Sequence, residues 1–320
     1  MKTNTIHSAL FGLAVGDALG VPVEFKDRDY LKQFPVVDMM EYGSHHQPKG
    51  TWSDDSSLAF CLAESLCKRY DINDIGQKFV QWAKEELWTP HGRVFDIGIS
   101  TDRAIYAIET GTKPILAGGS SEMDNGNGSL MRILPLLFYI KDLNIEKRFD
   151  IIKDVSSITH AHIRAVLACF IYLEYARHIL NGSDKWNAYA EMQKSVTHFL
   201  NTNAICSQIE MDKFHKILEL QIGKYEPQVL HKLEESEISS SGYVLDSLEA
   251  SLWCILTSNS YKETVLKAVN LGRDTDTTGA IAGGLAGLIY GYEAIPEKWL
   301  NVISRKEDII RLCDRLYKTL

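Results

Sequence analysis

One segment of this 320-residue chain indicates the architecture more strongly than any other: TTGAIAGGLAGLIYG, residues 277–291. Five of these residues are glycine, and each glycine inside a helix costs roughly 0.5–1 kcal/mol relative to alanine. A helix that keeps so many glycines needs neighbours that approach its backbone closely. The segment therefore predicts a buried central helix. A membrane-spanning helix is the alternative, but the apolar run is short and begins beside a cluster of charged residues.

Apolar residues recur with helical spacing along most of the chain. In Asp55–Tyr70 the apolar side chains fall at intervals of three and four residues, which places them on one helix face. The same spacing predicts helices over Ile75–Leu87, Ile99–Ile108, Leu130–Ile140, Ala161–Leu180, Val244–Leu256, Val265–Val269, Thr277–Tyr290 and Ile309–Tyr317. Two-residue alternation is nearly absent, and only Pro35–Met40 has the pattern of a short strand. The sequence therefore predicts an all-α protein of ten or more helices.

No stretch has the length or low complexity of an interdomain linker. The turn-rich segments are Tyr42–Ser53, Thr89–Arg93, Gly118–Gly128 and Glu234–Gly242. The polar stretch Asn181–Ser241 differs from the apolar halves on either side, and no internal repeat is visible. We therefore expect a compact single domain over residues 1–320, with residues 181–241 at its periphery.

Net charge and cysteine spacing limit the partners and the cellular compartment that we expect for this protein. Lys+Arg 34 and Asp+Glu 42 give a net charge of −8, which argues against a nucleic-acid or anionic-membrane partner. The six cysteines are scattered without a CxxC pair and read as reduced core residues. No secretory leader and no run of the roughly 18–20 apolar residues that span a bilayer is apparent. We expect a soluble cytoplasmic protein, and with no coiled-coil pattern we expect a monomer.

Acidic residues cluster twice, each time directly before a predicted helix. The clusters are Thr51-Trp52-Ser53-Asp54-Asp55-Ser56 and Gly272-Arg273-Asp274-Thr275-Asp276-Thr277-Thr278-Gly279. Helix capping explains each cluster alone, because Ser, Thr and Asp accept from the free amides of a helix start. Two such clusters together favour a shared site whose hard oxygens suit Mg²⁺, Mn²⁺ or Ca²⁺. Four carboxylates in one pocket would repel one another unless cations lay between them, and two ions about 3.5–4 Å apart fit that charge.

Three other motifs fail on the same residues. An EF-hand loop that starts at Asp274 would place Leu285 where a bidentate Glu is required. The DxDxT form of the haloacid-dehalogenase phosphatases should precede most of an α/β domain, yet only about forty residues follow here, and they look helical. The prenyl-synthase DDxxD pattern would place its last Asp at Leu58.

Two glycine-rich segments and two isolated polar residues each allow more than one interpretation. Gly12–Gly20, followed by Glu24, and Gly126–Ser129 could each cradle a phosphate with backbone amides or form a plain turn. Asp96 is typical of a helix start. His160 is typical of a capping or core histidine.

In this order along the chain, these pieces form a recognisable set. The set consists of Gly16-Asp17-Ala18-Leu19-Gly20-Val21-Pro22-Val23-Glu24, Trp52-Ser53-Asp54-Asp55-Ser56, Gly126-Asn127-Gly128-Ser129-Leu130-Met131-Arg132, Thr159-His160 and Gly272-Arg273-Asp274-Thr275-Asp276-Thr277. From about Ile6 to Tyr292 the chain resembles the ADP-ribosylglycohydrolase family, in particular the bacterial branch similar to dinitrogenase-reductase-activating glycohydrolase. The resemblance implies a compact all-α fold, a two-metal site with Mg²⁺ or Mn²⁺, and release of ADP-ribose from a modified protein. It implies an arginine side chain as the most frequent acceptor.

The resemblance also implies roles for individual residues. The metal ligands would be Ser53, Asp54, Asp55, Asp274, Asp276 and Thr277. The catalytic groups would be Glu24, Asp54, Asp55, Asp96 and Asp276. In that set Glu24 would hold or activate water, and Asp96 would face the bond to be cut, where it could pair with a guanidinium. ADP-ribose would lie against Gly126, Asn127, Gly128, Ser129, Met131 and His160, with Tyr243 stacked on adenine.

The chain departs from the family pattern at three positions. Ser53 and Ser56 stand where the family more often has Thr, a change that keeps the hydroxyl. Arg273 replaces the commoner Gly, which would bring a positive charge near the mouth of the site. Two alternatives stay open: hydrolysis of another ADP-ribosyl linkage, to serine, O-acetyl-ADP-ribose or nucleic acid, and ADP-ribose binding without catalysis.

Overall fold

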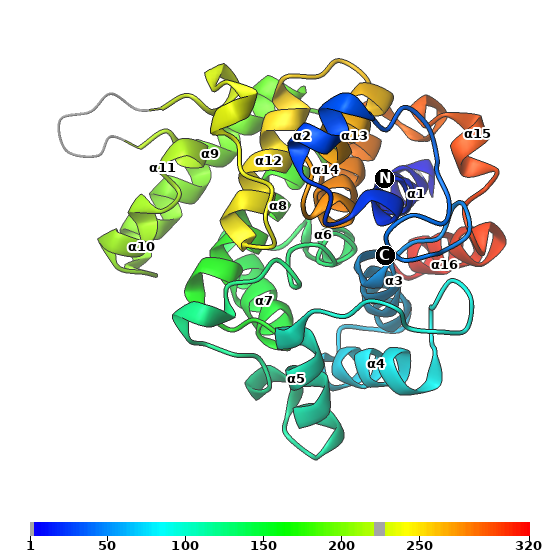
Figure 1. Ribbon diagram of the computed structural model, residues 1–320. Coiled ribbons are helices and arrows are strands. Elements are labelled where there is room, and N and C mark those ends of the chain that lie inside the picture. The colour runs from blue at the N-terminus through cyan, green and yellow to red at the C-terminus, as the bar shows by residue number, and fades with distance from the viewer. Residues whose placement is uncertain (1–2, 221–227) are drawn as a thin grey trace.

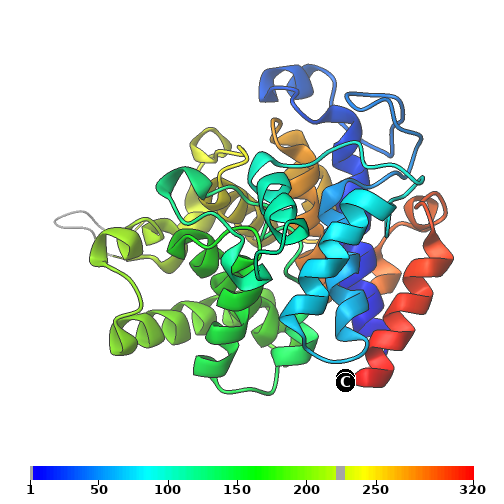
Figure 2. The same ribbon diagram turned by 90° about the horizontal axis from the view of Figure 1, so that it is seen from below.

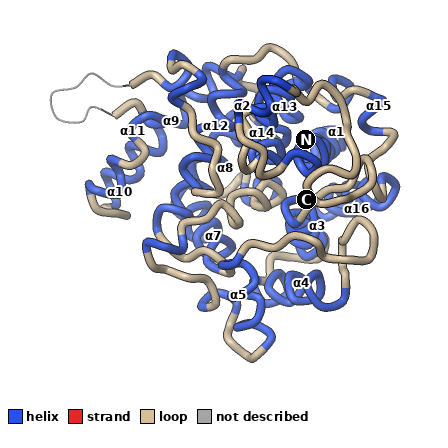
Figure 3. Tube along the Cα trace, in the orientation of Figure 1, coloured by secondary structure: helices blue, strands red, loops and turns tan. Residues whose placement is uncertain are grey.

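The computed structural model describes residues 3–220 and 228–320, and in that part of the chain the fold is all-α. It contains sixteen α-helices and six short 3-10 helices, and Figure 3 shows helices joined by loops. No strand occurs within the described ranges, where the only extended pairings are isolated bridges of Gly119 with His160 and of Gly126 with Tyr243. The expected all-α class is therefore confirmed.

A pair of closely packed helices forms the centre of the fold, α1 (Thr3–Gly20) and α14 (Thr275–Tyr290). A Cβ atom built on Gly16 would lie 2.0 Å from the carbonyl oxygen of Gly279, and one on Gly283 would lie 2.3 Å from that of Gly12. Only glycine leaves room for such backbone contact. The prediction of a buried glycine-rich central helix is confirmed.

The glycines of α1 correct both expectations for residues 12–20. Residues 12–20 lie inside a helix and form neither a phosphate cradle nor a turn. Their spacing of four residues places Gly12, Gly16 and Gly20 on the helix face that meets α14. Asn4–Val23 is also long and apolar enough to cross a bilayer, contrary to expectation, with a mean hydropathy of 1.5. Its most apolar window is 94% buried, which is the environment of a core helix.

The other helices surround this pair (Figures 1 and 2). Helices α12 (Val244–Leu256) and α13 (Tyr261–Asn270) pack on α14, whereas α3 (Asp54–Leu66) and α16 (Lys306–Thr319) pack on α1. The remaining helices are α2 (Arg28–Gln33), α4 (Ile72–Glu85), α5 (Ile99–Glu109), α6 (Leu136–Ile140), α7 (Ile145–Ser157), α8 (Ile163–Leu180), α9 (Lys185–Asn203), α10 (Gln208–Asp212), α11 (His215–Leu218) and α15 (Glu297–Leu300). Helices α9 to α11 lie at one edge of the molecule (Figure 1).

Two predicted elements differ in the structure: one helix is shorter than expected, and one short strand does not form. The helix expected over Leu130–Ile140 is restricted to α6, because Pro135 lacks an amide hydrogen and disfavours helical geometry at the residue before it. Pro35–Met40 forms no strand: the backbone N–H and C=O of Val36 bond the Asn270 side chain at 2.8 and 2.9 Å. The six cysteines are free, and four of them are buried.

Candidate active site

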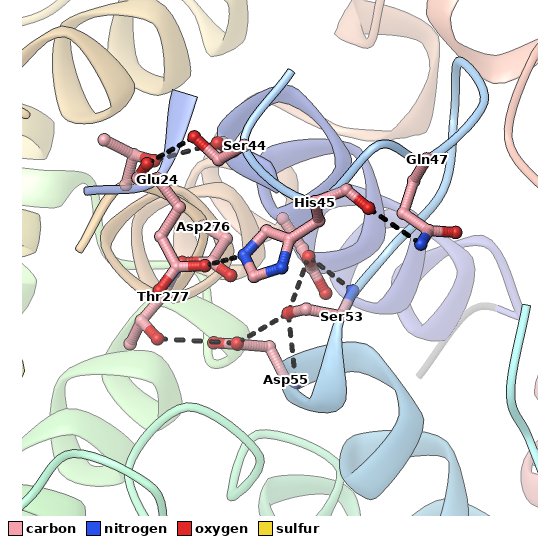
Figure 4. A network of polar contacts seen from close by, with 11 residues as sticks. Glu24, Ser44, His45, Gln47, Ser53, Asp55, Asp276 and Thr277 are labelled. Carbon is pink, nitrogen blue, oxygen red and sulfur yellow. Dashed lines mark hydrogen bonds and ion pairs between the residues drawn. The ribbon is translucent and has the colours of Figure 1, made fainter. Parts of the chain in front are cut away.

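The site forms where the first turns of α3 and α14 meet. Ser53 caps α3, with its hydroxyl 3.4 Å from the amide nitrogen of Asp55. The cap position of α14 is held by Asp274, whose side chain makes no capping bond. The Thr277 hydroxyl donates to Asp55 Oδ2 at 3.4 Å and so connects the two helices (Figure 4). Capping therefore accounts for Ser53 and leaves most of the carboxylates free for other chemistry.

A third helix contributes Asp17, which sequence reasoning did not single out. Asp17 is fully buried in α1. Its carboxylate accepts from the backbone amides of Ser53 and Ser56 at 2.8 and 3.0 Å. It also lies 3.0 and 2.5 Å from their hydroxyls. Asp17 thus fixes the start of α3, and it engages the hydroxyls of both serines. The available signal was a lone carboxylate within an otherwise apolar helix.

Carboxylates gather in two overlapping groups. Oxygens of Asp17, Asp55 and Asp276 lie within 4.8 Å of one another, and so do oxygens of Glu24, Asp274 and Asp276. Asp55 Oδ1 is buried and has no hydrogen-bond partner. A buried oxygen without a partner is costly unless something binds it. The donor set consists of hard oxygens and fits Mg²⁺ or Mn²⁺.

Electrostatics in this cluster also favour a cation. Burial, followed by repulsion from neighbouring carboxylates, raises the pKa of Asp54, Asp55 and Asp276 well above its ordinary value. Burial raises the pKa of Asp17 to about 6, against the lowering effect of the serine hydrogen bonds. The pKa of Glu24 rises to about 7, again chiefly through burial. A divalent cation among these groups would offset the repulsion and favour their ionised forms.

His45 completes the cluster on the side of the loop before α3. Its Nε2 contacts Glu24 Oε2 as a close ion pair, shown in Figure 4. Its ring lies against Phe25 and Phe95, with centroids 5.7 and 5.2 Å away. The hydrogen bond that His45 donates to the Glu24 carboxylate raises the pKa of His45. A single histidine in a loop carries no pattern, so the sequence offered no signal for this contact.

A cavity of about 580 Å³ lies beside the carboxylates. Many of the residues predicted for the site line it: Glu24, Asp54, Asp96, Gly126, Asn127, Gly128, Met131, His160, Asp274 and Thr277. Asp55 and Asp276 belong to the carboxylate groups without lining the cavity. Ser53, Ser129 and Tyr243 do not line it either. The structure therefore brings the two acidic clusters and the Gly126 loop to one place, from segments far apart in sequence.

The Gly126 loop is attached to α14 through Asn127. The Asn127 amide donates to Asp274 Oδ2 at 2.7 Å and to the Ser247 hydroxyl at 2.8 Å. His160 lies directly beneath the loop, where a Cβ on Gly128 would come within 2.8 Å of its ring. Burial lowers the pKa of His160 to about 3, so the ring is neutral at ordinary pH. No α-helix starts at Ser129, so the loop reaches the cavity as irregular backbone.

The whole chain matches a known family. The family model described as ADP-ribosylglycohydrolase covers residues 2–320. This chain belongs to the ADP-ribosylglycohydrolase family. It is therefore a hydrolase of ADP-ribosyl glycosidic linkages, and the family predicted from the motifs is confirmed.

Individual relatives share most of its length. The ADP-ribosylarginine hydrolase Tri1 of Serratia proteamaculans (strain 568) is 31% identical over 317 residues, or 97% of this chain and 78% of the relative. The ADP-ribosyl-[dinitrogen reductase] glycohydrolase of Rhodospirillum rubrum is 29% identical, over 96% of this chain and 94% of the relative. A solved structure of an "ADP-ribosylglycohydrolase-related protein complex" has a TM-score of 0.79 and 30% identity, covering 99% and 98% of the two chains.

Tyr243 in this ADP-ribosylglycohydrolase adjoins the cavity without lining it. Its backbone pairs with Gly126, and the preceding Gly242 lines the cavity. The Tyr243 hydroxyl accepts from Arg164 Nη1 at 3.0 Å. Arg164 is also paired with Glu210 of α10 at 2.7 Å, so the peripheral helices are connected to the edge of the site.

Arg273 does not line the cavity. Its side chain is exposed and borders a separate surface hollow with Asp27 and Glu237. Its backbone is left-handed, with φ 65°, a conformation that glycine adopts without strain. The expectation that Arg273 brings a positive charge to the mouth of the site is therefore not supported by the cavity lining.

Proposed function

We propose that this protein is a metal-dependent hydrolase that removes ADP-ribose from modified proteins by cleaving the N-glycosidic bond to arginine. The observation that carries the proposal is the convergence of buried carboxylates, one with an unpartnered oxygen, at a cavity that the Gly126 loop also lines. The arginine linkage is supported by the 31% identical relative named as an ADP-ribosylarginine hydrolase.

Two divalent cations, Mg²⁺ or Mn²⁺, would be held by Ser53, Asp54, Asp55, Asp274, Asp276 and Thr277. Asp276 belongs to both carboxylate groups, which supports its assignment as a ligand. Asp17 has four hydrogen-bond contacts with Ser53 and Ser56, so we assign it to hold the ligand helix in place. When bound, such cations supply Lewis-acid activation and a template for sugar hydroxyls.

The protein's own groups would do the rest of the chemistry. Cleavage of an N-glycosidic bond passes through an oxocarbenium-like state, which the carboxylates beside the cavity stabilise electrostatically. Glu24 lines the cavity and would accept the proton of the attacking water. The leaving guanidine would take up that proton, and Asp96, which lines the same cavity, would pair with the guanidinium that forms. Asp54 and Asp55 would assist through their negative charge.

The rest of the cavity would bind the ADP-ribosyl group. Gly126, Asn127, Gly128 and Ser129 would lie along its phosphates and ribose, with Met131 and the neutral His160 beside them. Tyr243 would stack on adenine. This arrangement is supported by the pairing of Tyr243 with Gly126 and by the position of Gly242 in the lining.

The cellular setting follows from the same proposal. The substrate would be an ADP-ribosylated protein and the product free ADP-ribose. We propose a cytoplasmic monomer with no membrane or nucleic-acid partner. We also propose a single domain over residues 1–320, with residues 181–241 at its edge, of which residues 221–227 lie outside the described part.

The experiment is release of free ADP-ribose from an arginine-modified protein and from a serine-modified protein, with and without Mg²⁺ or Mn²⁺. We expect metal-dependent release from arginine and a loss of roughly 100-fold or more for Asp276→Asn. Asp142→Asn is the matched control, because Asp142 is a surface carboxylate with 83% side-chain exposure. Release from serine alone would move the linkage to the alternative acceptor. Near-normal turnover by Asp276→Asn would contradict the metal assignment.

A further inference from the structure

Three large apolar side chains line the catalytic cavity while most of their surface remains in water. Phe25 is 72% exposed, Ile99 is 79% exposed and Met123 is 91% exposed. They come from the loop after η1 (Val21–Val23), the first residue of α5, and the 3-10 turn η3 (Glu122–Asp124). Side chains that both line a cavity and face solvent lie at its opening. We call these three residues the rim.

The backbone holds Phe25 in this exposed position. Its φ of 66° is left-handed, which is rare for a bulky side chain and persists only where the surroundings enforce it. The Phe25 amide donates to the Arg273 carbonyl at 2.7 Å, and the Arg273 amide donates to the Lys26 carbonyl at 2.6 Å. The ring also lies against His45, the partner of Glu24. An exposed aromatic in a strained conformation next to the catalytic carboxylate points to a role in binding.

Met123 lies in a turn that hydrogen bonds and an ion pair hold in place. Asp124 accepts from the Ser121 amide at 3.0 Å and from its hydroxyl at 2.5 Å, which closes the turn. Glu122 is paired with Arg164 at 3.2 Å on the other side. Asp124 itself is buried. The turn is fixed on both flanks, so the exposure of Met123 is a built feature of the wall.

We propose that the rim is the docking surface for the polypeptide that carries the ADP-ribosyl group. This inference rests on the proposed function, in which the ADP-ribosyl group fills the cavity and the acceptor side chain leaves through the opening. The backbone around the modified residue must then pass the rim. Its apolar side chains fit a substrate with apolar residues beside the modified arginine.

Charge favours a polypeptide over a nucleic acid as the occupant. The residues that line the cavity include five carboxylates, Glu24, Asp54, Asp96, Asp124 and Asp274. Arg103 is the one lysine or arginine among them. A nucleic-acid backbone would therefore find one cationic side chain to pair with among these lining residues, whereas a polypeptide that presents an arginine would find carboxylates.

The experiment compares kcat/KM on an arginine-ADP-ribosylated protein with kcat/KM on ADP-ribosylagmatine, a small conjugate that carries no polypeptide. The test variant combines Phe25→Asn, Ile99→Gln and Met123→Gln; asparagine is chosen because it tolerates a left-handed backbone. The matched controls are Leu116→Gln and Ile209→Gln, at residues 71% and 72% exposed that do not line the cavity. If the triple variant does not fold, Met123→Gln alone provides the same comparison.

We expect the triple variant to lose roughly 10-fold in kcat/KM on the modified protein, mainly through KM. Its ratio of protein to agmatine activity should fall at least about 5-fold, whereas the controls keep the wild-type ratio. An equal loss on both substrates, or no loss on the protein, would overturn the docking rim. If the unaltered enzyme releases ADP-ribose from neither substrate, the proposed function is wrong, and the docking proposal that rests on it is wrong too. A change of ratio in an active enzyme tests the rim alone.

Discussion

The Asp17 carboxylate of α1 accepts a hydrogen bond from the backbone amide of Ser53 at 2.8 Å and lies 3.0 Å from the Ser53 hydroxyl. The central helix pair is thereby connected to the helix that carries two of the proposed metal ligands. Asp276 lies in the first turn of α14, the other helix of that pair. The close approach of α1 and α14 therefore sets the distance between the two acidic clusters.

We expect Asp17→Asn to weaken metal binding by roughly 10- to 100-fold, the usual effect of losing a residue that orients metal ligands. The amide can still accept at one oxygen, but it cannot serve the amides and hydroxyls of both Ser53 and Ser56. Titration calorimetry with Mn²⁺ measures the change. Asp142→Asn is the control for loss of one surface charge. Unchanged affinity in Asp17→Asn would show that α3 holds its ligands without help from α1.

Gly16→Ala should be strongly destabilising. The new Cβ would lie 2.0 Å from the Gly279 carbonyl oxygen, which is backbone and cannot rotate away. Overpacking of this kind costs about 1–3 kcal/mol and sometimes more. We expect the free energy of unfolding, measured in urea, to fall by about 3 kcal/mol or more.

The control for this substitution is Gly98→Ala, where the nearest atom to the added Cβ is the Thr101 hydroxyl at 3.9 Å. A change within about 0.5 kcal/mol is expected there. If Gly16→Ala were equally mild, α1 and α14 would have to separate easily, and the glycines of both helices would have another explanation.

How much of the site the sequence could predict depends on whether its residues are neighbours in the chain. Asp54 and Asp55, like Asp274 and Asp276, stand beside hydroxyls at a helix start, so local pattern was enough to find them. Asp17 and His45 were missed, because their roles exist only through contacts with Ser53 and Glu24 formed on folding.

For the fold, too, local pattern was sufficient where contacts between distant segments were not needed. Helical periodicity found most helices, and the glycines of residues 277–291 correctly indicated close packing. For the matching glycines of residues 12–20 the sequence predicts a phosphate cradle or a turn, because a glycine-rich segment is ambiguous until its partner helix is known. The false helix start at Leu130 has a local cause that could have been used, namely Pro135.

Stability without metal should fall as the pH rises. Burial raises the pKa of Asp17 from 3.8 to about 6 and that of Glu24 from 4.5 to about 7. Between the unfolded-state pKa and the folded-state pKa of each group, the folded protein binds more protons than the unfolded chain. The free energy of unfolding therefore decreases with increasing pH. This contribution is fully present below about pH 4 and is lost through about pH 7.

Bound Mg²⁺ or Mn²⁺ should reverse this trend, because cations stabilise the ionised carboxylates and bind the folded state only. We therefore expect the gain in melting temperature on adding metal to be small near pH 5 and to grow towards pH 8. Scanning calorimetry with and without EDTA measures it, and Asp276→Asn should abolish most of the gain. A metal effect that is the same at both pH values would mean that the cations bind away from the buried carboxylates.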